Sequence, residues 1–110
     1  MSDPFIHLND LPDFIPCDGY HGKMVHTDTM TIAHWTITGG KCLPEHAHPH
    51  QQIVNLIEGE FELTVEGTPV HMKPGDVYVI DRQRLHSGRA ITDCRIIDVW
   101  HPVREDYRQG

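Results

Sequence analysis

Short apolar segments alternate along the chain with glycine, proline and polar turns, which is the pattern of a protein built from strands. The clearest strand is predicted at 60–66, where Phe61, Leu63 and Val65 alternate with polar residues. This period of two places the apolar side chains on one face and the polar ones on the other. The sequence predicts about eight strands in all, the others including 24–26, 30–38, 46–58, 70–73, 77–80 and 94–100.

The same pattern contains no convincing helix. The last predicted strand ends at His101-Pro102, because proline cannot donate to a strand ladder. Short strands without helices predict an all-β fold, either a jelly roll or a small barrel. Residues 1–22 hold three prolines and little periodicity, so we expect an N-terminal arm that lies on the body or on a partner subunit. A single barrel domain is then expected over 23–110.

Length and charge narrow the class of protein. The 110 residues suit one domain with one core, and no apolar run approaches the roughly 20 residues that span a bilayer. The net charge of -7, without a cluster of Lys or Arg, argues against nucleic acid as a partner. No secretory signal is visible, and Cys17, Cys42 and Cys94 form an odd set without a C-x-x-C pair. We therefore expect a cytoplasmic protein with reduced, buried thiols.

Histidine is the outlier of the composition. Ten of the 110 residues are histidines, and His46, His48 and His50 are packed into five positions. On a strand, His46, His48 and Gln52 would share one face. His86, after the loop that follows 77–80, is the candidate ligand from a second segment. A solvated polar face is the alternative to a metal site for the His-x-His pair, and His50 can be read in the same way.

These residues resemble the two motifs of the cupin superfamily. The first motif, G-x5-H-x-H-x3-E-x6-G, is matched in spacing by Gly40, His46, His48, Gln52 and Gly59, with glutamine in the glutamate position. The resemblance implies a cupin-type jelly-roll β-barrel.

The second motif, G-x5-P-x-G-x2-H-x3-N, is matched only in part. Gly75 and His86 are present, while Asp81, Gln83 and Ala90 stand where the motif has proline, glycine and asparagine. The two matches together cover residues 40 to 90.

By position, the resemblance implies that His46, His48, Gln52 and His86 bind a divalent transition metal. Imidazole ligation suits nickel, zinc, iron or copper, and manganese where oxygen ligands contribute. Because Gln52 is neutral, the charge of the ion would be uncompensated, which makes a stronger Lewis acid and weakens the case for redox oxygenase chemistry.

The C-terminal segment 98–107 is similar to the tail D-x-[FW]-x-P-x-R-x-D-[FY] of small single-domain cupins. Among these are enzymes of pectin and alginate degradation that linearise unsaturated uronates. The resemblance implies that Asp98 and Arg104 are catalytic and that Trp100 and Arg104 contact the substrate. Independently, strand parity puts Asp98 on the same face as the apolar side chains of Ile96 and Trp100. Burying a carboxylate there costs free energy of folding, so Asp98 is expected to be paired or to have a role in function. Pairing with Arg104 or capping of a backbone turn is the alternative.

The hypothesis that follows is a metal-dependent lyase or isomerase, acting on a small acidic sugar and opening an unsaturated uronate ring to a linear ketouronate. Asp98 would move the proton, Arg104 would clamp the carboxylate with two hydrogen bonds, and Trp100 would form an apolar wall. A homodimer is expected, as for many small cupins. Two alternatives remain: a metal-dependent dioxygenase or oxidase, and a non-enzymatic cupin that binds a small ligand or a metal.

Overall fold

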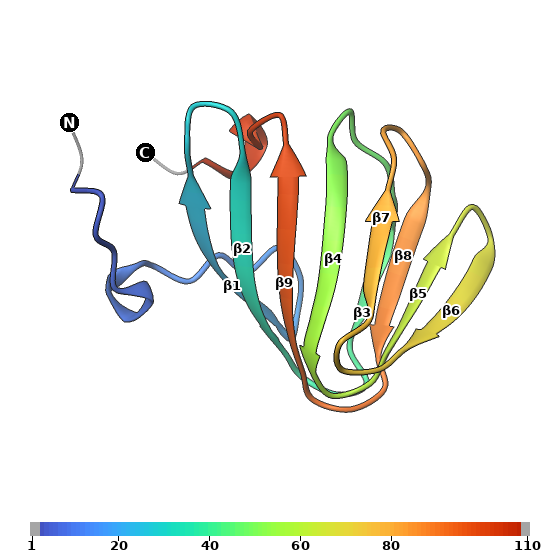
Figure 1. Cartoon of the computed structure of the whole chain (residues 1–110). Helices are drawn as coiled ribbons and strands as arrows, with labels where there is room; N and C mark the ends of the chain where they lie inside the picture. Colours follow the sequence, from blue (N-terminus) through green and yellow to red (C-terminus); the bar gives the residue numbers. More distant parts are fainter. Residues whose placement is uncertain (1–2, 109–110) are drawn as a thin grey trace.

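The computed structural model describes residues 3–108, which fold as two facing antiparallel sheets (Figure 1). The five-stranded sheet contains, in spatial order, β1 (Tyr20–His26), β2 (Thr31–Ile37), β9 (Cys94–His101), β4 (Gln51–Glu58) and β7 (Val77–Ile80). The four-stranded sheet contains β3 (Cys42–His46), β8 (His86–Ala90), β5 (Phe61–Val65) and β6 (Thr68–Met72). This confirms the all-β fold predicted from the sequence.

Helical structure in residues 3–108 is limited to two single 3-10 turns, η1 (Leu8–Asp10) and η2 (Glu105–Tyr107). Within this described range, no helix has the length and apolar character needed to cross a bilayer.

The core lies between the two sheets and follows the alternation of the strands. In β9 every second residue is buried, namely Cys94, Ile96, Asp98 and Trp100. β5 contributes Phe61 and Leu63 from the opposite sheet, and their alternation with polar residues confirms the clearest strand of the sequence. Each large side chain buried in this way contributes about 1.5–3 kcal/mol to stability. Asp98 and Trp100 are thus held inside the barrel by strand parity.

The predicted strand over 46–58 is wrong in one respect, because the structure divides it into β3 and β4, which belong to different sheets. Residues 47–50 form the crossing between them, and proline at position 49 cannot donate to a ladder there. His46 therefore ends β3, where it pairs with His86 of β8. Gln52 lies near the start of β4, where it pairs with Trp100 and Ile80.

β3 and β8 are additional to the strands predicted individually. The β8 sequence, His-Ser-Gly-Arg-Ala, lacks the apolar alternation of a strand. Gly88 takes the inward position opposite Leu63 of β5, and a side chain there would overlap the ring of Phe61. The large neighbour thus fills the space that an apolar side chain of β8 would occupy, so the strand carries no hydrophobic signal.

The expected boundary between the arm and the barrel, after residue 22, falls inside β1. The arm is also tied to the body before it enters that strand. Phe14 forms a two-way backbone bridge with Gly22 at 2.8 Å in each direction, and its ring packs 4.7 Å from that of Tyr107. Backbone pairing of this kind leaves no trace in the periodicity of the sequence.

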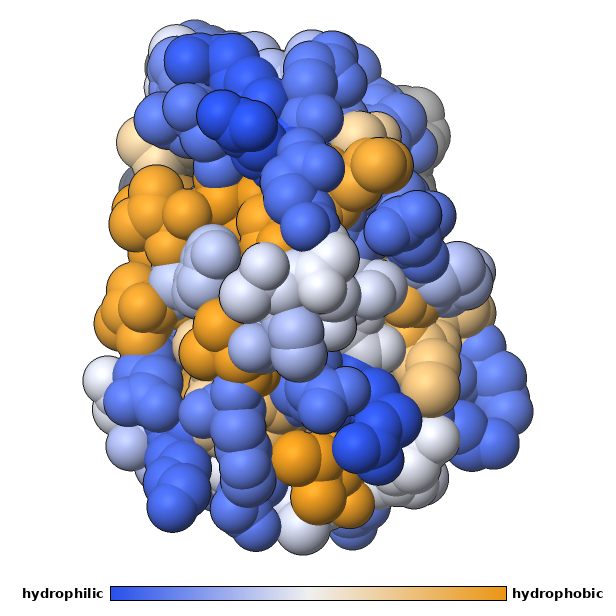
Figure 2. Space-filling view, turned by 90° about the vertical axis from the view of Figure 1, so that its right-hand side faces the viewer, coloured by the Kyte–Doolittle hydropathy of each residue, from blue (hydrophilic) through white to orange (hydrophobic). Residues whose placement is uncertain are grey.

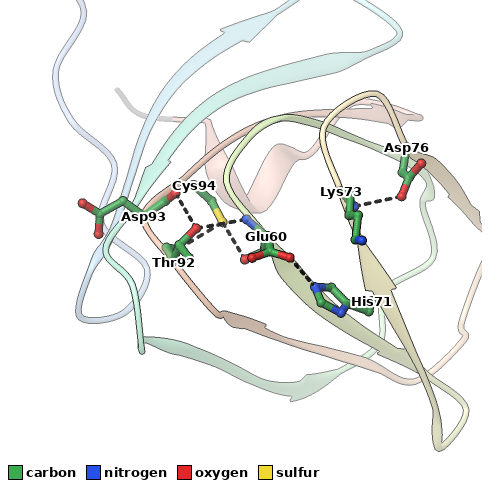
Figure 3. A network of polar contacts seen from close by, with 7 residues as sticks. All are labelled: Glu60, His71, Lys73, Asp76, Thr92, Asp93 and Cys94. Atoms are coloured by element: carbon green, nitrogen blue, oxygen red, sulfur yellow. Dashed lines mark hydrogen bonds and ion pairs between the residues drawn. The ribbon is translucent and has the colours of Figure 1, made fainter.

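The loop between β8 and β9 is fastened to the start of β5 by a polar network (Figure 3). The Cys94 thiol donates to the carbonyl oxygens of Glu60 and Thr92, at 3.1 and 3.2 Å. The Thr92 hydroxyl accepts from the Glu60 N–H at 3.0 Å. Cys94 is buried, as expected, and Cys17 is partly buried, whereas Cys42 is exposed, so the expectation of burial is wrong for Cys42. Cys42 lies on β3, at the edge of its sheet.

The outer faces of the two sheets differ in chemistry. The five-stranded sheet carries an apolar row that runs in register across all of its strands, through Val25, Ile32, Val99, Ile53 and Val79. The four-stranded sheet carries charged and polar residues at the corresponding outer positions, among them Glu62, Arg89 and His71. In the view of Figure 2, hydrophobic side chains form separate clusters on the left, at the upper right and near the bottom, with hydrophilic side chains between and around them.

Candidate metal centre

Three imidazoles from two strands and one connection meet at one end of the barrel. His46 is the last residue of β3, His86 is the first residue of β8, and His48 lies in the crossing to β4. Candidate ligand atoms of the three residues all lie within 4.8 Å of one another, so this group could hold a metal ion. The ring centroids of His46 and His86 are 4.2 Å apart, and those of His48 and His86 are 4.9 Å apart.

Each of the three rings is oriented by a backbone carbonyl two residues away, through its Nδ1 atom. The distances are 2.9 Å for His46 to Pro44, 2.9 Å for His86 to Arg84 and 3.2 Å for His48 to His50. A carbonyl oxygen only accepts, so Nδ1 carries the hydrogen in each ring and Nε2 keeps its lone pair. This is the arrangement that orients histidine as a metal ligand.

Gln52 adds a fourth donor atom to the same point. Its Oε1 lies 3.1 Å from Nε2 of His48. With the hydrogen of His48 on Nδ1, two lone-pair atoms face each other at this distance, and they repel unless a cation lies beside them. Neighbouring ligands of one ion, each about 2.1 Å from it, are separated by about 3.0–3.4 Å. The Nε2 atom of His86 is buried without a hydrogen-bond partner among residues 3–108. The donor set therefore fits a divalent transition metal.

The protonation of the buried imidazoles agrees with this role. Burial lowers the pKa of His48 to about 4, with the charges of Arg104 and His86 acting in the same direction. Burial also lowers the pKa of His86. Both rings are neutral near pH 7, as a metal ligand must be.

Asp98 lies beside the cluster and is 8% exposed. Its Oδ2 accepts a hydrogen bond of 3.0 Å from the indole N–H of Trp35, while its Oδ1 has no partner among the described residues. Burial raises the pKa of Asp98 to about 7, against the opposing effects of the nearby Gln52 amide, the hydrogen bond from Trp35 and the Arg104 charge. A carboxyl group with a pKa near neutrality can both accept and donate a proton. The amide of Gln52 thus stands between Asp98 and His48.

Arg104 is held in place by Asp106 and two aromatic rings, and it is 3% exposed. Its Nε and Nη2 donate to the two carboxylate oxygens of Asp106, at 3.0 and 2.7 Å. Its guanidinium carbon lies 3.7 Å from the ring centre of Tyr107 and 5.0 Å from that of Trp100. Nη1 is buried without a partner in the described part of the chain. Asp98 therefore pairs with Trp35, and the expected alternative of an Asp98–Arg104 ion pair is replaced by Arg104–Asp106.

A cavity between the two sheets adjoins the histidine cluster and Asp98. Its polar and aromatic lining includes His46, Gln52, His86, Asp98 and Trp100. Apolar side chains from both sheets complete the wall, among them Ile37, Leu43, Val54, Phe61, Leu63 and Ile96. The lining thus combines polar groups that could bind a ligand with an apolar wall.

The structure thus brings all the sequence-predicted site residues into one end of the barrel. Sequence reasoning missed Trp35, which holds Asp98, and Tyr107, which stacks on Arg104. Strand parity within β2 could have indicated the inward position of Trp35, whereas the partner of its indole N–H could not be inferred. The alternative of a solvated His50 is wrong, because this residue is buried and its carbonyl orients His48.

The fold and the site together define a small β-barrel protein with three histidines inside the barrel that could hold a metal ion. The family model described as "Cupin domain" matches residues 33–100, which is more than half of the chain. The protein belongs to the cupins, and the jelly-roll fold expected from the two motifs is confirmed.

Three proteins of known name are similar to the chain. The pectin degradation protein KdgF of Dickeya dadantii is 27% identical over 82% of this chain and 84% of its own length. The L-ectoine synthase of a Marinomonas species is 38% identical over 61% of this chain, which spans about half (54%) of that relative. The H2HPP isomerase of Bacillus subtilis is 28% identical over 94% of this chain and 44% of its own length.

Solved structures agree at the level of the whole barrel. The structure of KdgF from a Halomonas species superposes with a TM-score of 0.86, at 26% identity, and covers 96% of this chain and 98% of that one. An RmlC-like cupin from Shewanella frigidimarina gives a TM-score of 0.89 at 24% identity, with 97% of each chain covered, which shows the fold.

Proposed function

We propose that the protein is a metal-dependent isomerase or lyase that opens the ring of an unsaturated uronate and yields the linear ketouronate. The observation that carries the proposal is the buried carboxyl of Asp98, with a free Oδ1 and a pKa near neutrality, beside a three-histidine centre. The similarity to KdgF over nearly the whole of both chains supports the same substrate class. The similarity to an isomerase from Bacillus subtilis supports the reaction class.

His46, His48, His86 and Gln52 would hold the metal. Nickel, zinc, iron and manganese all accept such a set, because imidazole nitrogens and an amide oxygen suit each of them. A divalent ion bound there supplies Lewis-acid polarisation of a substrate oxygen.

Asp98 would act at Oδ1, the oxygen that Trp35 leaves free. It would take the proton of the ring hydroxyl whose ionisation opens the sugar, and it would return a proton to carbon as the enol becomes a ketone. The reaction is an isomerisation, so the proton count is conserved. The hydrogen bond from Trp35 holds the carboxyl in one orientation throughout, which keeps Oδ1 directed toward the cavity.

Arg104 would bind the substrate carboxylate through Nη1. Asp106 already accepts hydrogen bonds from Nε and Nη2 of the guanidinium. The two hydrogen bonds to the substrate carboxylate that the sequence predicts would therefore come from the other edge, which includes Nη1. Stacking on Tyr107 and Trp100 fixes the plane of the guanidinium. Trp100 also lines the cavity and would form the apolar wall for the sugar.

The test is turnover of an unsaturated monouronate by the purified, metal-loaded protein, followed by loss of the ultraviolet absorbance of the conjugated double bond. We expect loss of absorbance at the same rate with and without dioxygen, and a linear keto acid as the product by mass spectrometry and NMR. Turnover that requires dioxygen would favour the dioxygenase or oxidase alternative. Binding of the uronate without any chemical change would favour the ligand-binding alternative, and either result would contradict the proposal.

We also propose that the protein works in the cytoplasm as a homodimer, joined through the apolar row on the five-stranded sheet. Val79 is 60% exposed and Ile53 is 40% exposed within this row, and an exposed apolar row of this kind favours an interface. A second copy of the same face is the simplest complement, since two-fold interfaces bury one patch against itself. The charged outer face of the other sheet would remain in water.

Placing a lysine in the middle of this face should disrupt the dimer. For Val79→Lys we expect light scattering to show a fall from twice the chain mass of 12.6 kDa to that of a monomer, because the interface cannot solvate the ammonium group. Thr64→Lys on the outer face of β5 is the matched control and should leave the mass unchanged. A monomeric wild-type protein, or a Val79→Lys variant that remains a dimer, would contradict this interface.

A further inference from the structure

Tyr20, the first residue of β1, places an unpartnered hydroxyl inside the barrel. The side chain is 3% exposed and lines the same cavity as His46 and Asp98. Its hydroxyl is buried with no hydrogen-bond partner among residues 3–108. Buried polar groups are almost always paired, so an unpaired one that faces a cavity indicates a group meant for a ligand.

The surroundings of Tyr20 hold its ring and keep its hydroxyl neutral. The ring packs edge-on against Trp35, with centroids 6.1 Å apart. Leu43 and Phe61 line the cavity from the opposite sheet. Burial raises the pKa of Tyr20 well above its usual range, so the hydroxyl keeps its hydrogen and can donate as well as accept.

Tyr20 and the metal centre belong to different levels of the barrel. Through Ile37 of β2, Tyr20 is in register with Cys94 of β9, whereas Asp98 lies further along the same strand. Four residues of strand correspond to about 13 Å between the two backbone levels. Both side chains line the one cavity from these levels, so a ligand that is held at the metal end and reaches the other level would meet the hydroxyl of Tyr20.

We infer that the Tyr20 hydroxyl is a specificity contact, which hydrogen-bonds a hydroxyl group of the sugar at the end remote from the metal centre. The inference rests on the proposed function and names a substrate contact that the metal ligands, Asp98 and Arg104 do not supply. Since the contact forms with the bound sugar before and during the reaction, it contributes to binding more than to the chemical step.

The test is Tyr20→Phe, compared with Tyr78→Phe, which removes the same hydroxyl from a partly buried ring on β7 that packs against the core. For Tyr20→Phe we expect KM to rise about tenfold with kcat little changed, the size of one neutral hydrogen bond. For a uronate that lacks the contacted hydroxyl, wild type and Tyr20→Phe should have the same KM. Tyr78→Phe should leave both substrates unaffected.

Thermal unfolding of the substrate-free variants separates this role from a structural one. Because the hydroxyl has no partner in the described structure, its removal should leave the Tm of Tyr20→Phe equal to or above that of wild type. A lower Tm together with an unchanged KM would assign the hydroxyl to the fold and overturn the inference. An active wild type with an unchanged Tyr20→Phe would overturn it while the proposed function stands, whereas an inactive wild type would refute the proposed function itself.

Discussion

Replacing Asp98 by asparagine should lower turnover of an unsaturated uronate by about a hundredfold or more while the metal content stays the same. Asparagine has nearly the same shape and can still accept the hydrogen bond from Trp35, but it cannot take up or release a proton. General acid and base groups contribute about 10²–10⁴ in rate, which sets the size of the effect. Steady-state kinetics and elemental analysis of the same preparation measure the two quantities.

Asp28→Asn is the control for this substitution, because Asp28 is an exposed carboxylate in the turn between β1 and β2. Its turnover should match that of wild type. If Asp98→Asn retained full turnover, Asp98 would have no part in the mechanism. If it lost metal as well as turnover, the carboxyl would act by orienting Gln52 rather than by moving a proton.

The pH dependence of the stability of the metal-free protein tests the pKa of Asp98 independently of turnover. Its folded pKa of about 7 lies above its ordinary value of 3.8, so the folded state retains a proton that the unfolded chain loses. The cost of ionising it is absent below about pH 4 and complete above about pH 7. Asp98→Asn should therefore raise the Tm of chelator-treated protein by several degrees at about pH 8 and by much less at about pH 5. A gain that is equal at both pH values would show that the wild-type carboxyl does not titrate in this range.

Replacing His86 by alanine should abolish tight metal binding and, with it, turnover. His86 is the one member of the triad contributed by β8, and its Nε2 is the buried ligand atom without a partner in the described residues. Loss of an orienting neighbour of a ligand costs about 10–100-fold in metal affinity, so loss of the ligand itself should cost at least about a hundredfold. Competition with a chromophoric chelator measures the affinity, and circular dichroism checks the fold.

His71→Ala is the matched control, since His71 is an exposed histidine on β6 that pairs with Glu60. It should bind metal as wild type does. His46→Ala is a second test that removes a less buried ligand. It still measures the contribution of the triad if the His86 variant does not fold. Wild-type affinity in both His46→Ala and His86→Ala would show that the three imidazoles do not form the metal centre.

Local patterns predicted most of the strands because each depends on residues close in sequence. In the structure, buried and less buried residues alternate around Phe61 and Leu63 and along β9, as predicted. The sequence did not predict β8, because its central inward residue is Gly88. The space beside this glycine is filled by the ring of Phe61 from the neighbouring strand. The division of 46–58 into two strands was not predicted either, since the pattern of apolar and polar residues does not show which sheet a strand joins.

Periodicity and motif spacing act over a few residues, and for this reason they were enough to predict the all-β class, the candidate ligands and the inward position of Asp98. How these groups are used depends on contacts made in the tertiary structure. In the folded chain, Trp35 is the hydrogen-bond partner of Asp98, and Asp106 binds one edge of the Arg104 guanidinium. Tyr20 lines the cavity. Such contacts join residues far apart in the chain, and they depend on how the two sheets pack, which no local pattern encodes.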